Sequence, residues 1–185
     1  MTVSIGVMGS AGDSGGQTNR EALAAKANEL ALAIAQRQLH LLTGATTGIV
    51  YVVGKAAHDA GTLHLGISPA SNAHEHVEKY QLPLDACDRI IFTGFGLKGR
   101  NVVLVRSCDV VIFIAGSIGS LNEFTIAHDE GKVIGCLTGT GGVADEVDYL
   151  LSKFSKKTDA TIFRDDDPEK LIDACLAELQ KRAVN

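Results

Sequence analysis

The chain has 185 residues, about the length of one domain that can bury a full hydrophobic core. Its net charge is −5 and it has no long basic run, which argues against nucleic-acid binding through a broad phosphate-contacting face. It contains no run of 18 or more apolar residues, and its N-terminal segment lacks the basic region of a signal peptide. We therefore expect a cytoplasmic protein with no membrane partner.

Apolar segments suited to strands alternate with helical segments along the whole chain. Strands are predicted at residues 3–8, 39–43, 63–67, 89–93, 109–114, 132–137 and 160–163. Helices are predicted between them, including residues 49–60 before Gly61 and a last helix opened by Pro168. The strands are continuously apolar, so both faces of the sheet should be covered. The sequence thus predicts one domain over residues 1–185, an α/β Rossmann-like doubly wound fold with a mainly parallel sheet and helices on both faces.

Two clusters of possible metal ligands are expected to have structural roles and to bind no metal. Residues 72–88 are the least periodic stretch and are expected to form a loop, with a short helical turn as the alternative. His74 and His76 within it are expected to be exposed, with no third ligand. The acidic run at residues 165–167 is expected to be a solvated helix start. The four cysteines lie far apart without a C-x-x-C pair, which suits buried thiols in a reducing compartment. We therefore predict no metal site.

Four glycine-rich loops follow predicted strands and open helices, at residues 9–16, 44–48, 116–119 and 139–142. Glycine lets the backbone approach an anion closely, and a helix N-terminus supplies free N–H groups. The alternative is that these loops are only tight turns. Their convergence at one edge of the sheet favours a phosphate site. The candidate ligand-binding residues are Gly9, Ser10, Gly12, Gly44, Thr46, Thr47, Gly48, Gly116, Ser117, Ile118, Gly119 and Ser120.

Residues 94–99 also match the pattern G-x-G-x-x-G. The dinucleotide fingerprint belongs on the first strand–helix unit and needs an acidic residue about 20 positions later. The match here lies midway along the chain, and residues 115–117 hold no acid. A nicotinamide cofactor is therefore not favoured, and no P-loop sequence occurs.

Arg100 and Glu123 are charged residues near the starts of two predicted helices, and each has a functional and a structural interpretation. Glu123 lies one turn inside the helix that the 116–119 loop opens, where it could face a sugar or a reacting bond. The alternative is a capping box, in which Glu123 returns to the N–H of Ser120. Arg100 opens the preceding helix and could pair with a phosphate or with Glu123, or else be a solvated helix residue.

Residues 94–130 resemble the signature region of the "lonely guy" family. Arg100 is followed by Ser107 and Asp109, an apolar strand, and the stretch from Ala115 to Glu123, similar to the family's Pro-Gly-Gly-x-Gly-Thr-x-x-Glu. The first-strand Gly-Ser pair and the second loop also agree, so the resemblance covers most of the chain. Four positions depart from the motif, namely Ala115, Ser117, Ser120 and Asn122. With these departures the motif more closely resembles that of a related branch, the DNA-processing-protein-like Rossmann proteins. That branch includes molybdenum-cofactor carriers.

The resemblance implies a small phosphorylated, nucleotide-like ligand and two possible functions. The first is a phosphoribohydrolase that cleaves the N-glycosidic bond of nucleoside 5′-monophosphates, with Arg100 and Glu123 catalytic. The second is a non-catalytic carrier or sensor of a nucleotide or of a phosphorylated pterin of the molybdopterin type. Neither requires a further cofactor. The resemblance also implies a homodimer, which small residues at positions 24–25 and 31–33 support weakly.

Overall fold

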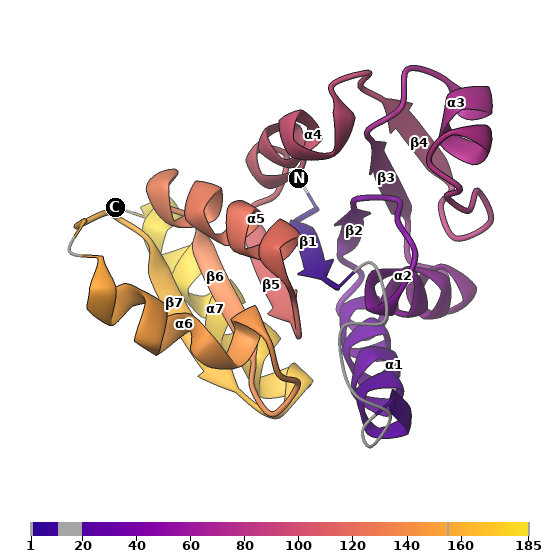
Figure 1. The fold of residues 1–185 in the computed structure, drawn as a ribbon. Helices are drawn as coiled ribbons and strands as arrows, with labels where there is room; N and C mark the ends of the chain where they lie inside the picture. The colour runs from indigo at the N-terminus through magenta and orange to yellow at the C-terminus, as the bar shows by residue number, and fades with distance from the viewer. Residues whose placement is uncertain (1, 11–19, 155, 185) are drawn as a thin grey trace.

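The computed structural model describes residues 2–10, 20–154 and 156–184, and it forms one parallel sheet with helices on both faces (Figure 1). The strand order is β4-β3-β2-β1-β5-β6-β7, and every neighbouring pair is parallel. This confirms the predicted fold class, with the strand at residues 109–114 near the middle. The strands are β1 Ser4–Gly9, β2 His40–Thr43, β3 His64–Ser68, β4 Arg89–Phe92, β5 Val110–Ile114, β6 Val133–Leu137 and β7 Thr161–Asp165.

The helices divide between the two faces because buried side chains alternate along the central strands. On β5, Ile112 belongs to the core under α1, α2 and α7, whereas Phe113 belongs to the core under α4, α5 and α6. The short helix α3 lies beside β4 at one end of the sheet (Figure 1). The helices are α1 Arg20–Gln36, α2 Ile49–Asp59, α3 Ala73–Glu78, α4 Gly96–Arg106, α5 Ile118–Asp129, α6 Val143–Lys153 and α7 Pro168–Val184.

The strand order reverses direction between β1 and β5. The chain runs outward from β1 to β4 and then returns to place β5 on the other side of β1. Gly9 pairs with Ile114 at the carboxyl ends of these strands. A methyl group on Gly9 would lie 2.7 Å from the carbonyl oxygen of Ile114, so only glycine fits there. Such a switch point is where open α/β sheets bind ligands.

The stretch at residues 72–88 contains the short helix α3, where the sequence allowed a helical turn. Asn72 caps α3 by accepting a hydrogen bond from the N–H of Glu75 at 2.9 Å. His76 is fully buried, and its ring nitrogens contact the Ser68 hydroxyl at 2.8 Å and the Pro83 carbonyl at 3.0 Å. The prediction of an exposed His76 is therefore wrong, because its imidazole joins β3 to the segment after α3.

The cysteines are free thiols in this fold. Cys108, Cys136 and Cys175 are buried, and Cys87 is half-buried. Burial raises the pKa of each of these thiols to about 12, so they remain protonated at neutral pH.

Among the described helices, none has the length and apolar character needed to cross a membrane.

Candidate functional site

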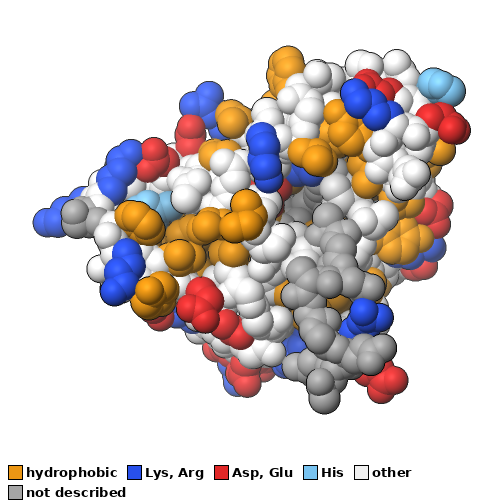
Figure 2. All heavy atoms as spheres, viewed as in Figure 1, with side chains coloured by type: hydrophobic (Ala, Val, Ile, Leu, Met, Phe, Trp, Pro, Cys, Tyr) orange, Lys and Arg blue, Asp and Glu red, His pale blue; other side chains and the backbone are white. Residues whose placement is uncertain are grey.

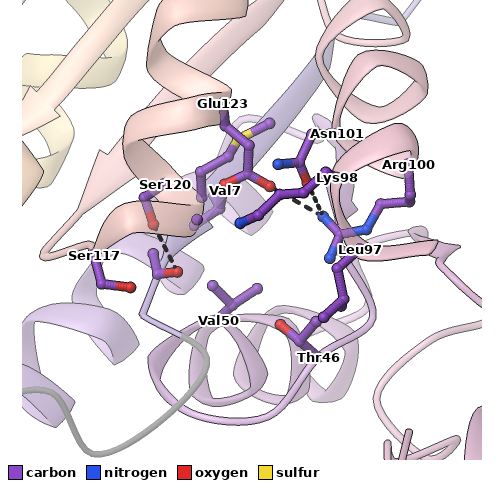
Figure 3. Close-up of a pocket in the computed structure, with 14 residues that line it drawn as sticks. Val7, Thr46, Val50, Leu97, Lys98, Arg100, Asn101, Ser117, Ser120 and Glu123 are labelled. Carbon is purple, nitrogen blue, oxygen red and sulfur yellow. Dashed lines mark hydrogen bonds and ion pairs between the residues drawn. The ribbon is translucent and has the colours of Figure 1, made fainter.

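A pocket of about 190 Å³ opens at the switch point, between the end of β1, the loop after β2, and helices α4 and α5 (Figure 3). The structure brings together residues that lie far apart in the sequence. Eight of the predicted site residues line this pocket: Gly9, Gly44, Thr46, Arg100, Ser117, Gly119, Ser120 and Glu123.

Other predicted residues lie beside the pocket without lining it. The Ser10 hydroxyl accepts a hydrogen bond from the N–H of Gly116 at 3.2 Å, which ties the loops after β1 and β5 together. Gly48 is the N-cap of α2, Thr47 is exposed, and Ile118 is 75% exposed. Gly12 lies outside the described residues.

Helix α5 presents its N-terminus to the pocket. The backbone turns sharply before it, with φ of 52° at Ala115 and 110° at Gly116. Ser117 is the N-cap, and its carbonyl accepts the first helical hydrogen bond from Leu121 at 2.8 Å. The N–H groups of residues 118–120 precede that bond and so have no acceptor inside the helix. Together with the helix dipole, they form a site suited to an anion.

Ser120 and Glu123 do not form a capping box. Ser120 is the third residue of α5, and its hydroxyl donates to the Gly9 carbonyl at 2.9 Å. Glu123 instead accepts a hydrogen bond from Arg100 Nη1 at 3.0 Å. The capping alternative is therefore wrong, and Glu123 is available for the pocket.

Arg100 and Glu123 form a buried ion pair. Their side chains are only 5% and 9% exposed, so the interpretation of Arg100 as a solvated residue is also wrong. Nη1 of Arg100 donates a second hydrogen bond to Oδ1 of Asn101 at 2.9 Å. The guanidinium packs on Gly44, where a methyl group would lie 2.6 Å from its terminal nitrogens.

Burial sets the ionisation of this pair. Desolvation raises the pKa of Glu123 to about 7, although Arg100 and Lys98 oppose the rise. Desolvation also lowers the pKa of Arg100, and Glu123 offsets part of that effect. In the part of the chain that the structure describes, Nε of Arg100 is buried without a hydrogen-bond partner. A bound group that brings a new charge can therefore change the pKa of Glu123, and one that brings an acceptor can bind Nε of Arg100.

The sequence analysis missed Lys98 and Asn101, which also line the pocket. Lys98 extends from α4 toward α5, and its Nζ lies 3.7 Å from the position a methyl group on Gly119 would occupy (Figure 3). Asn101 donates to Oδ1 of Asn122 on α5 at 2.7 Å. Lys98 and Asn101 are three residues apart, so they lie on the same side of the helix that carries Arg100. This spacing is the signal in the sequence that could have found them.

The fourth glycine-rich loop does not join the pocket. The N–H groups of Gly139 and Gly141 donate to the carboxylate of Asp145, at 2.8 and 2.7 Å. This loop binds the side chain of its own helix and lies beside the loop that opens α5, where the Thr140 hydroxyl accepts a hydrogen bond from the N–H of Ala115 at 2.8 Å.

The G-x-G-x-x-G segment is a structural turn. It follows β4 at the edge of the sheet, and only its later part, with Leu97 and Lys98, reaches the pocket. The N–H groups of Gly94 and Gly96 already donate to the carbonyls of Ala70 and Pro69, at 2.8 and 3.0 Å. These amides are not free to bind a pyrophosphate.

Comparisons with known proteins agree with the resemblance seen in the sequence. A protein of Archaeoglobus fulgidus, named only as uncharacterized, is 34% identical over 133 residues, which is 72% of this chain and 78% of that protein. The molybdenum cofactor binding protein of Rippkaea orientalis is 28% identical, with a TM-score of 0.72 over 100% of this chain and 99% of the other. The molybdenum cofactor carrier protein of Chlamydomonas reinhardtii is 25% identical, with a TM-score of 0.73 over 98% and 99%. The model of the SLOG cluster4 family matches residues 2–172, and the chain therefore belongs to that family.

Proposed function

We propose that this protein binds a small phosphomonoester of a flat heterocycle in the pocket at the switch point. The observation that carries the proposal is the open N-terminus of α5, which shares the pocket with Lys98. N–H groups without an acceptor inside their helix, a helix dipole and a lysine ammonium all favour a phosphate dianion. Arg100 and Glu123 lie deeper, where they would meet the part of the ligand next to the phosphate.

Apolar and polar groups of the same pocket suit the rest of such a ligand. Val50 of α2 and Leu97 of α4 give it apolar surface, which a flat ring can cover. Thr46 adds a hydroxyl that can bind a polar ring edge. Ligand sites commonly combine apolar walls with a few polar groups in this way.

A phosphorylated pterin of the molybdopterin type is the first candidate ligand. The proteins of R. orientalis and C. reinhardtii are named for binding or carrying the molybdenum cofactor, and this chain matches nearly their whole length. In this proposal the ligand is cargo that the protein binds and releases unchanged. Such a carrier role requires no further cofactor.

A phosphoribohydrolase is the second candidate, and the buried Arg100–Glu123 pair favours it. In that reaction a water oxygen bonds to C1′ of the ribose, the C1′–N bond breaks, and the base leaves with a proton. The Glu123 carboxylate would stabilise the positive charge that develops on the sugar. Its pKa of about 7 also suits proton transfer from water at neutral pH.

Two measurements test the proposal. Mass spectrometry of small molecules released from the purified protein should show a phosphomonoester, and calorimetry should show that AMP or inorganic phosphate binds. A base-release assay on AMP, GMP, IMP and CMP, with Glu123→Gln and Arg100→Ala as controls, separates the two candidates. Release of base that both substitutions abolish supports the hydrolase, and binding without release supports the carrier. If no phosphomonoester binds at millimolar concentration, the proposed function is wrong.

A further inference from the structure

A buried polar network lies behind the loop that supports Arg100. His64 on β3 and Thr43 at the end of β2 are each 1% exposed. Nε2 of His64 lies 2.8 Å from the Thr43 hydroxyl, and Nδ1 contacts the carbonyl of Ala86. The Thr43 oxygen in turn accepts a hydrogen bond from the N–H of Ala45 at 3.2 Å. The network therefore ends on the backbone of the loop that contains Gly44.

The acceptors fix the direction of these hydrogen bonds. A carbonyl only accepts, so Nδ1 of His64 carries the hydrogen that Ala86 receives. Nε2 is then the acceptor for the Thr43 hydroxyl, which leaves the Thr43 oxygen free to accept from Ala45. Burial lowers the pKa of His64, which keeps the imidazole in the neutral form this arrangement needs.

Two glycines make room for the network. A methyl group on Gly54 would lie 2.5 Å from Cε1 of His64, and one on Gly66 would lie 2.8 Å from Cβ of Ala45. Ala45 has a φ of 51°, a conformation that costs energy for a residue other than glycine. The Thr43 hydroxyl stabilises this conformation, which determines where the neighbouring Gly44 lies beneath the Arg100 guanidinium.

We propose that His64 and Thr43 are positioning residues that hold the loop at residues 44–46 in the shape that places Arg100 against Glu123 and the ligand. The part of this inference that concerns the ligand rests on the proposed function. A shift of the loop moves Gly44, and the guanidinium that packs on it must follow. The network acts on the ligand through Arg100 and through Thr46, which lies in the same loop and also lines the pocket.

The decisive variant is Thr43→Val, which keeps the shape of the side chain and removes its hydroxyl. Thr43→Ser retains the hydroxyl and should behave like the native protein. Thr62→Val is the matched control, because Thr62 is also buried but its hydroxyl has no hydrogen-bond partner among the described residues. Thr43→Ala serves as a second test of the lost hydroxyl if valine disturbs the fold.

The first readout needs no ligand. Arg100 lowers the pKa of Glu123, so a displaced guanidinium should raise it. We expect carbon-13 NMR of Glu123 to show a rise of about half a unit or more in Thr43→Val, since an opposite charge at contact shifts a pKa by roughly one to three units. The Thr43→Ser and Thr62→Val proteins should titrate like the native protein. An unchanged Glu123 pKa in both Thr43→Val and Thr43→Ala would overturn the proposal.

The second readout is the affinity for AMP or inorganic phosphate. Thr43→Val should weaken it about tenfold, whereas in an Arg100→Ala background the same substitution should weaken it by clearly less, because only the route through Thr46 remains. An additive loss in the double variant would overturn the route through Arg100. If the native protein binds neither probe, the proposed function fails, but a shifted Glu123 pKa would still support the positioning role.

Discussion

A carboxylate buried against a single arginine gives this site its chemical character. Desolvation raises the pKa of Glu123 by more than Arg100 and Lys98 lower it, so the pKa rises from the usual 4.5 to about 7. The unfolded chain therefore releases this proton at lower pH than the folded chain does. Below about pH 4.5 both states are protonated, and the folded state loses stability as the pH rises toward 7.

The first prediction compares native protein with Glu123→Gln across this pH range. One unit of pKa shift corresponds to about 1.4 kcal/mol, so ionisation of Glu123 should cost about 3 kcal/mol of unfolding free energy between pH 4.5 and 7.5. Glutamine does not ionise, and the variant should gain stability relative to the native protein by about that amount over the range. Urea unfolding at each pH measures the difference. A difference that falls with rising pH would mean that Arg100 outweighs desolvation.

Gly44 gives the second prediction, because the guanidinium of Arg100 occupies the space a side chain would need. Gly44→Ala places a methyl group 2.6 Å from both terminal nitrogens. The arginine must move, and overpacking together with a weakened buried pair should lower the unfolding free energy by about 2–3 kcal/mol. Binding of AMP should weaken with it.

Gly119→Ala is the matched control for this substitution at the same pocket. Its added methyl group would lie 3.7 Å from Lys98 Nζ, an ordinary contact, and alanine suits a helix better than glycine. The unfolding free energy should rise by at most about 1 kcal/mol. Equal losses in the two variants would show that Arg100 does not determine the effect at Gly44.

Residue types identified the charged pair but not its full surroundings. Glu123 stood out because it lies one turn inside a helix that a glycine-rich loop opens, and Arg100 stood out through the resemblance to the motif of the "lonely guy" family. Lys98 and Asn101 carry the same polar character as any exposed helix residue, and only the packing of α4 against α5 turns them to the pocket. The pairing of Thr43 with His64 joins two strands and has no local signal in either.

At the scale of elements, apolar runs and glycine punctuation predicted all seven strands closely. Helix α3 was the weakest point, since it has only six residues and no long apolar face. Its start depends on a cap at Asn72, and its burial depends on a tertiary contact of His76 with Ser68. Short elements of this kind are fixed by side-chain hydrogen bonds rather than by periodicity.

The loop at residues 139–142 shows why glycine content alone does not identify an anion site. Its N–H groups face a carboxylate that the chain itself supplies, Asp145 in the first turn of α6. The third prediction is that Asp145→Ala lowers the unfolding free energy by about 1–2 kcal/mol, because it removes the acceptor of two exposed backbone hydrogen bonds. Ligand affinity should stay at the native value, because this loop does not line the pocket.

Thermal melts and calorimetry on the same preparation measure both quantities for Asp145→Ala. Asp145→Asn is the matched variant, because it keeps one acceptor oxygen and should lose less stability. A large loss of ligand affinity in Asp145→Ala would place the fourth loop in the site after all.

On the scale of the whole molecule, the site follows from the topology more than from any one motif. The reversal of strand order between β1 and β5 opens a gap at the carboxyl edge, and the loops nearest to it hold the pocket residues. The sequence supported a parallel sheet and its central strand, so this edge could be expected. It did not give the strand order, which brings the loops after β1 and β5 together.

The fourth prediction is that two copies of the chain associate. Of the small residues first considered for an interface, Ala31 and Ala33 are buried in the core of this chain, whereas Ala25 is exposed. Figure 2 shows instead that hydrophobic side chains gather on the surface over α5 and α6. Tyr149 on α6 is 60% exposed and Phe154, just after α6, is 69% exposed.

Exposed aromatic side chains of this kind are enriched at protein interfaces, since their burial contributes more than that of smaller residues. Light scattering at micromolar concentration should therefore give about twice the chain mass of 19.4 kDa. Tyr149→Asp combined with Phe154→Asp should shift the mass toward one chain, because a dimer would bury each new charge unpaired. Leu32→Asp, on the exposed side of α1 at 50% exposure, is the matched control and should leave the mass unchanged. A native mass near 19.4 kDa would rule out the dimer, and a dimer unaffected by the double substitution would place its interface elsewhere.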